Sequence, residues 1–383
     1  MNLLLEGNKM KKIMERIKKY GLLCKKHYVI TVGLLCVLVA IITIGINVYE
    51  NFINVKILES SEKYKNAKKI NFDDKTLETA VRDLYNRHYG NIYDVDLEEL
   101  SALEIQNKEI ESLDILKYMT SLQTLNLVNC KVNDIEPIRT LENLEQIDLS
   151  GNNIIDISPL SGLLDVEVLN LSNNSIMDVK PIQAMNRLVL LDLHNNNIGN
   201  LSFNFRSLPN LKTLNIANNR IVDTAPFSDL TTVMDLNLGG NNIFKITPMN
   251  NMNSLIILNL SSNSLTQIDT LGTMPVLSEL NIATNNLVDI DFVNDIQSLK
   301  DLNISSNDIT NIDKLINNPN LESLSIRATK ITMIPVVKQL PKLNSIYLND
   351  NFDRSQIDSM QSHFKNGDKI TKKYFLEKKY DLK

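Results

Sequence analysis

The chain has 383 residues, of which 43% are hydrophobic and 22% are charged. This composition excludes an intrinsically disordered chain and allows a core larger than that of one ordinary domain. The formal net charge of -5 provides no overall basic surface for a nucleic-acid partner. The 3 cysteines (Cys24, Cys36 and Cys130) match neither a zinc site nor a disulfide framework.

The N-terminal part of the sequence has the pattern of a membrane anchor. Residues 28–49 contain 22 residues without a charge, which as a helix would be about 33 Å long. The 18 residues before this segment hold seven Lys or Arg and the 18 after it hold three, so the positive-inside rule predicts a cytoplasmic N-terminus at 1–27. A cleaved signal peptide is the alternative, but its apolar core would run only about 7–15 residues. We therefore expect one uncleaved signal-anchor helix with the rest of the chain outside the cell membrane.

Two segments separate this anchor from the main body. Residues 50–69 are polar and are predicted to form a stalk. Residues 70–99 contain Leu77, Val81 and Leu84 at helical spacing, with Asp73 or Asp74 placed to cap the helix start. The second segment is therefore predicted to be a helical N-terminal cap.

An internal repeat dominates residues 100–351. Its leading apolar residues recur every 22 positions, with one interval of 23: Leu100, Leu122, Leu144, Val166, Leu188, Leu211, Val233, Leu255, Leu277, Leu299, Leu321 and Leu343. Each unit begins with alternating apolar residues, which predict a short strand, and continues with apolar residues spaced by three, which favour 3₁₀ turns or extended returns. The sequence predicts an α/β solenoid of about 12 coils with a parallel sheet.

The ninth position of most units is an asparagine among apolar neighbours, as in Asn152, Asn174 and Asn196. An inward amide there can bond the turn backbones of its own and adjacent coils. Cys130 and Thr329 occupy the same position and can partly replace the asparagine amide. Lys108, in the first coil, cannot replace the amide from an inward position. This row is interpreted as structural.

The units resemble the 22-residue leucine-rich repeat, L-x-x-L-x-L-x-x-N/C-x-I-x-x-I-x-x-L-x-x-L-x-x. The cap and the segment Asn153–Leu160 (NIIDISPL) are similar to those of internalin-like surface proteins of Gram-positive bacteria. The resemblance implies a horseshoe with the sheet on its concave side, and a role in binding. It does not extend to the immunoglobulin-like module and wall-sorting tail of internalins. Residues 352–383 instead predict a C-terminal cap with Ile357, Met360 and Phe364, followed by a solvated basic tail.

No motif of an enzyme occurs in the sequence, and neither a cofactor nor a metal site is predicted. Among the 4 histidines, His194 is the one expected on the concave face, where it is either an ordinary surface residue or a titrating switch. The inserted residue in the 23-residue unit is expected to bulge on the return side, with Phe203 and Phe205 filling core rather than binding a ligand.

Two outward rows follow the strands of the predicted sheet. One is an Asn/Asp row from Glu104 to Tyr347, interpreted as a solvated ladder that stabilises neighbouring strands. The other is varied and contains adjacent apolar residues, which makes the concave face the candidate site or an incidental exposure. The candidate ligand-binding residues are Val168, Val189, Leu190, Asp192, His194 and Ile257.

The sequence therefore predicts a membrane-anchored, extracytoplasmic protein that binds a protein or peptide without catalysis. Residues 100–350 carry 27 acidic against 16 basic side chains, which favours a partner with a basic surface. Two other functions stay open: a self-associating scaffold of the cell envelope, and an adaptor whose repeats face the cytoplasm.

Overall fold

The structure is a computed structural model that describes residues 61–88, 90–199, 201, 205–348, 352 and 355. The predicted membrane helix, the segment before it, most of the stalk, and the C-terminal cap and tail lie outside these residues. Within the described part, no helix is long and apolar enough to cross a bilayer. The chain divides into a smaller unit, the residues up to Lys69 with Arg82–Tyr93, and a larger unit, Ile70–Val81 with the residues from Asp94 onward.

The smaller unit is held by short-range contacts among its aromatic and basic side chains. A 3₁₀ helix, η1 (Glu62–Tyr64), precedes Lys69, which forms an isolated antiparallel bridge with Tyr93. The Tyr64 and Tyr93 rings meet edge to face with centroids 5.3 Å apart. The guanidinium of Arg87 donates to the Asn91 carbonyl at 3.2 Å, which closes the loop between them.

Two helices occupy the segment predicted to be a cap, α3 (Lys75–Leu84) and α4 (Asp94–Leu97). Asp74 caps α3, because its Oδ1 accepts from the backbone N of Leu77 at 2.8 Å. Leu77 and Val81 are buried as expected. Leu84 is the last residue of α3, and its side chain is 53% exposed.

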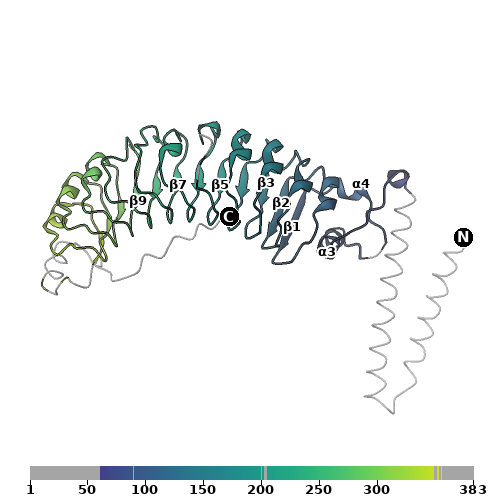
Figure 1. Cartoon of the computed structure of the whole chain (residues 1–383), viewed down its shortest axis with the longest axis horizontal. Helices are drawn as coiled ribbons and strands as arrows, with labels where there is room; N and C mark the ends of the chain where they lie inside the picture. The colour runs from purple at the N-terminus through teal and green to yellow at the C-terminus, as the bar shows by residue number, and fades with distance from the viewer. Residues whose placement is uncertain are drawn as a thin grey trace, which may run out of the picture. The chain divides into compact units, whose positions relative to one another are not determined.

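Twelve short strands form one parallel sheet in sequential order, which confirms the predicted solenoid (Figure 1). Each strand pairs with the next at the interval of the sequence repeat, as in Val168 opposite Leu190. We number each coil after its strand. The strands are β1 (Ala102–Gln106), β2 (Thr124–Val128), β3 (Gln146–Asp148), β4 (Val168–Asn170), β5 (Leu190–Asp192), β6 (Thr213–Asn215), β7 (Asp235–Asn237), β8 (Ile257–Asn259), β9 (Glu279–Asn281), β10 (Asp301–Asn303), β11 (Ser323–Ser325) and β12 (Ser345–Tyr347).

The return arms on the other side of the coils are mostly 3₁₀ helices, as the spacing of three predicts. They are η2 (Asp114–Tyr118), η3 (Glu136–Ile138), η4 (Ser158–Gly162), η5 (Lys180–Ala184), η6 (Phe205–Ser207), η7 (Ala225–Phe227), η8 (Asp291–Asp295), η9 (Asp313–Asn317) and η10 (Pro335–Gln339). Prolines begin several of them, including Pro159 and Pro181, because the first residues of a 3₁₀ turn need no backbone donor. In Figure 1 the strands follow the inner side of the arc of coils and the 3₁₀ turns follow its outer side.

One continuous core runs through the stack between strands and returns. In coil 4 its members are all fully buried: Val166, Leu169, Leu171, Ile176, Val179, Ile182 and Met185. Burial of such a side chain contributes about 1.5–3 kcal/mol, and a single coil cannot bury both of its sides alone. Stacking therefore supplies the stability, and it makes the inner surface rigid.

The inward asparagines form the predicted ladder. Asn241 is typical: its Oδ1 accepts from the backbone N of Ile221 at 3.0 Å, and its Nδ2 donates to the carbonyls of Ile216 and Leu238 at 3.1 and 3.0 Å. Each amide thereby joins its own coil to the preceding one. Cys130 replaces this amide in coil 2, where its Sγ contacts the Ile105 and Val128 carbonyls. Burial raises the pKa of the Cys130 thiol.

The inserted residue of the 23-residue unit lies before η6. Phe205 is fully buried and stacks on Phe227 of the next coil, with ring centroids 5.4 Å apart, which confirms its core role. Phe203 lies outside the described residues.

Candidate binding site on the concave face

The sheet brings three of the predicted apolar residues together. Val168 on β4 and Leu190 on β5 are register partners, and both are half-buried on the exposed side of the sheet. Val189 directly precedes β5 and is 39% exposed. We call Val168, Val189, Leu190, Asp192 and His194 the central cluster. Ile257 does not join it, because it lies on β8, with Thr213 and Asp235 between it and Leu190 in the same row.

The Asn/Asp row is a hydrogen-bonding ladder more than a solvated surface. Its oxygens accept from the backbone N two residues later, as Asp148 Oδ1 does from Ser150 at 2.9 Å. Its amides donate to the preceding coil, as Asn170 Nδ2 does to Asp148 Oδ2 at 3.0 Å. These bonds confirm the expected ladder between neighbouring strands, but the row is not solvated at Asn170 and Asp192, which are each 7% exposed. Unpaired strand-end donors near a sheet surface require such acceptors.

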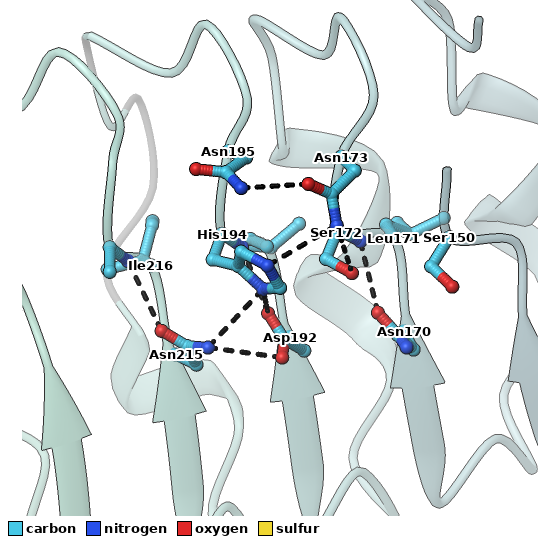
Figure 2. A network of polar contacts seen from close by, with 12 residues as sticks. Ser150, Asn170, Leu171, Ser172, Asn173, Asp192, His194, Asn195, Asn215 and Ile216 are labelled. Atoms are coloured by element: carbon cyan, nitrogen blue, oxygen red, sulfur yellow. Dashed lines mark hydrogen bonds and ion pairs between the residues drawn. The ribbon is translucent and has the colours of Figure 1, made fainter. Parts of the chain in front are cut away.

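Asp192 accepts hydrogen bonds from His194 and Asn215 (Figure 2). Its Oδ1 lies 2.9 Å from the backbone N and 2.8 Å from the Nδ1 of His194, and its Oδ2 accepts from Asn215 Nδ2 at 3.1 Å. Because an ionised carboxylate only accepts, the proton of the neutral imidazole lies on Nδ1. Nε2 then accepts from Asn173 Nδ2 at 3.3 Å. The imidazole is therefore fixed in one orientation.

His194 is the large side chain in a row of small ones. The neighbouring coils have Ser150, Ser172, Ala217 and Gly239 at the equivalent position. Its side chain is 29% exposed, against 10% for that of Asp192. The imidazole therefore projects above its small neighbours, just after the end of the strand that begins with Leu190.

Asp192 also raises the pKa of His194 above its usual value, chiefly through the hydrogen bond to Nδ1. Burial acts in the opposite direction and is outweighed. On protonation Nε2 becomes a donor that faces the Asn173 amide, whose Oδ1 already accepts from Asn195 Nδ2 at 2.8 Å. Protonation therefore requires the Asn173 amide to turn over, which couples His194 to the adjacent amides.

Replacement of Asp192 by Asn should lower the pKa of His194 toward 6.5. The substitution retains an acceptor for the backbone N of His194 but removes the negative charge. Because the folded pKa of His194 is raised, its contribution to stability is complete below about pH 6.5 and is lost as the pH rises through the folded value. Nuclear magnetic resonance of ¹³C-histidine, assigned with His194→Gln, measures both pKa values. Equal values in the two proteins would contradict the role of Asp192.

A charged group borders the central cluster at the start of the strands. Arg187 donates to Asp165 Oδ1 and to Glu167 Oε1, each at 2.9 Å. These carboxylates raise the pKa of Arg187. All three side chains are about half exposed and contribute little to stability, but they give the apolar patch a polar rim.

The central cluster offers an apolar pair and one oriented imidazole, with a charged rim beside it. No group of three or more His, Cys, Asp or Glu side chains that could hold a metal lies within the described residues. The sequence did not single out Asn173 or Asn195, which lie beside His194 with φ of 55° and 54°. Their signal is the repeated Asn-Asn doublet, since asparagine tolerates the left-handed region better than most residues.

The comparisons agree with this architecture. The family model for leucine rich repeats (2 copies) matches residues 120–162. An internalin (inlF) from Listeria monocytogenes is 26% identical with a TM-score of 0.64, over 76% of this chain and 93% of that one. The functional domain of InlJ from the same species is 19% identical with a TM-score of 0.63, over 73% and 60%. No curated protein matches the sequence.

A plant structure shares the fold alone. The leucine-rich repeat ectodomain of the receptor kinase GASSHO1/SCHENGEN3 from Arabidopsis thaliana, in complex with Casparian strip integrity factor 2, is 20% identical with a TM-score of 0.55, over 64% of this chain and 32% of that one.

The parallel sheet, the asparagine ladder and the repeat match define a solenoid of the leucine-rich repeat class. Proteins of this class generally act as scaffolds for protein–protein binding and present an extended concave surface. The chain is an internalin-like leucine-rich repeat protein, similar in structure to the internalins of Listeria.

Proposed function

We propose that the protein is a single-pass membrane protein that displays its repeats outside the cell and binds a protein or peptide without catalysis. Residues 28–49 would be the anchor, with 1–27 in the cytoplasm, as the distribution of Lys and Arg favours. The plant receptor ectodomain named above was solved with a factor bound, which supports a binding role for such a stack.

The observation that carries the binding role is the central cluster. The coils next to His194 have Ser150, Ser172, Ala217 and Gly239 at its position, whereas coils 4 and 5 combine adjacent Val168 and Leu190 with an oriented imidazole. An apolar patch beside a fixed polar group and a charged rim is the pattern of an interface centre. The acidic balance of the coils favours a partner with a basic surface.

Leu190→Asp should abolish capture of the partner, since a charge in an interface centre costs about 2 kcal/mol or more, which is roughly 30-fold in affinity. Full-length protein serves as bait for affinity purification, and the captured protein is then titrated against each variant. Ser345→Asp places the same charge at the equivalent position of β12 and should leave binding unchanged. Far-UV circular dichroism should be the same for all three proteins.

Equal binding by Leu190→Asp and the parent protein would remove the central cluster from the site. Two further measurements decide between the alternatives. If the captured protein is a second copy of the chain, and light scattering detects dimers, the protein is a self-associating scaffold. Repeats that survive protease added to intact protoplasts would indicate an adaptor that faces the cytoplasm.

A further inference from the structure

Five apolar side chains form a second exposed row outside the concave face. Each occupies the twelfth position of its coil, directly after a buried aliphatic residue. They are Ile155 (58% exposed), Met177 (56%), Val222 (45%), Phe244 (61%) and Val288 (57%). We call them the lateral row. Because these large apolar side chains occupy one repeated position, they form a stripe. Apolar residues scattered singly over a surface form no such stripe.

The coils hold this row in register. For four of the five members, the carbonyl of the buried residue before the member accepts from a backbone N of the next coil, as Ile154 does from Ser175 at 2.9 Å and Ile221 from Asn242 at 2.9 Å. The members therefore project from a hydrogen-bonded edge that runs from coil to coil. This edge is preformed, so docking on it would require little ordering of the protein.

The composition of the twelfth position changes toward both ends of the stack. It is polar in coils 1, 2, 10 and 11, which have Glu111, Asn133, Thr310 and Thr332. The apolar members are confined to coils 3–9, where Gly199 in coil 5 and Thr266 in coil 8 interrupt the row. An apolar centre with polar ends is the anatomy of a docking surface.

The next position along each coil is mostly acidic beside the members of the lateral row. It holds Asp156, Asp178, Asp223 and Asp289, with Lys245 as the exception beside Phe244. Two copies of the chain that met at this row would bring these carboxylates together, and juxtaposed like charges disfavour such a contact. A suitable occupant combines apolar and basic side chains.

The chain carries such a segment beyond the residues that the structure describes. Residues 365–383 contain seven Lys against three acidic residues. Apolar residues are interspersed among these lysines: Ile370, Tyr374, Phe375, Leu376, Tyr380 and Leu382. The described chain ends at Ser355, after the last coil. If residues 355–364 form the predicted cap on the last coil, residues 365–383 can still span about 60 Å when extended, whereas the six rungs from β12 back to β6, the coil of Val222, cover about 29 Å at the strand spacing.

We propose that residues 365–383 dock on the lateral row of the same chain, with apolar side chains on Val222, Phe244 and Val288 and lysines opposite the bordering aspartates. The tether raises the effective concentration of the segment to the millimolar range, so modest contacts suffice.

Photo-crosslinking of the full chain in lipid nanodiscs tests this contact. p-Benzoylphenylalanine replaces Phe244 or Val288 in separate proteins, and mass spectrometry identifies the crosslinked peptides. The matched control carries the same group at Leu164, an exposed leucine at a different position of coil 3 (51% exposed). Mixing of ¹⁴N and ¹⁵N protein before reconstitution separates contacts within one chain from contacts between copies.

We expect single-isotope crosslinks from positions 244 and 288 to peptides within 365–383, and background levels from position 164. Joint replacement of four lysines by Glu should abolish these crosslinks: Lys372, Lys373, Lys378 and Lys379. Mixed-isotope crosslinks between copies, or tail crosslinks no stronger than those of position 164, would overturn the proposal. Crosslinks that survive the charge reversal would overturn the electrostatic pairing.

Discussion

Asn241→Ala should destabilise the protein by about 3 kcal/mol, because it leaves a buried backbone donor without its acceptor. Asn241 is 5% exposed and its Oδ1 accepts from the backbone N of Ile221. The three carbonyls that its Nδ2 contacts keep other donors. Ile216 O accepts from Asn219, Leu238 O accepts from Asn263, and Gly239 O accepts from the backbone N of Asn218. The cost therefore arises mainly at the N–H of Ile221 and at the cavity between coils 6 and 7.

Urea-induced unfolding of the full chain in detergent, followed by far-UV circular dichroism, measures this loss. Asn242→Ala is the matched control, since Asn242 is the exposed next residue and its truncation should change stability by less than about 0.5 kcal/mol. A loss below about 1 kcal/mol for Asn241→Ala would show that water satisfies the donor and that the ladder is dispensable. A solenoid is stabilised by contacts between neighbouring coils, so the transition should also become less cooperative.

The repeat predicts most of the fold because each rule acts within one coil. Alternation places Leu169 and Leu171 in the core, and the spacing of three predicts the 3₁₀ returns, since both depend only on local geometry. The inward asparagines are predictable for the same reason: a polar residue that recurs among buried ones must bond to backbone. The same spacing does not show that Leu84 is exposed at the end of α3, because periodicity does not show where a helix stops.

The site was harder to predict because its contacts join residues of different coils. The alternation correctly placed Val168 and Leu190 on one face, and the interval of 22 made them neighbours. It could not show that the Asp192 carboxylate accepts hydrogen bonds from His194 and Asn215, because these bonds depend on side-chain geometry across two strands. Ile257 shares their row but not their location, since a row extends along the whole stack. The row to which a residue belongs shows which face of the sheet it lies on. Whether two residues of a row form one patch depends on how many strands separate them.

Phe227→Ala should cost about 3–5 kcal/mol, since the truncation leaves a cavity beside a rigid neighbour. The Phe227 ring is fully buried and stacks on Phe205 at an interplanar angle of 22°. Phe205 belongs to the coil that carries the inserted residue, so the pair fills the space between an irregular coil and a regular one. Close packing cannot relax there without displacing η6 or η7.

Leu164→Ala is the matched control for this prediction, because it truncates a large apolar side chain that is 51% exposed and lies outside the lateral row. Its stability should change by no more than about 0.5 kcal/mol. Urea unfolding compares the two variants, and hydrogen exchange should locate the increased opening of Phe227→Ala in coils 5 and 6. Equal losses would contradict the prediction, because the buried ring pair would then contribute no more to stability than an exposed leucine.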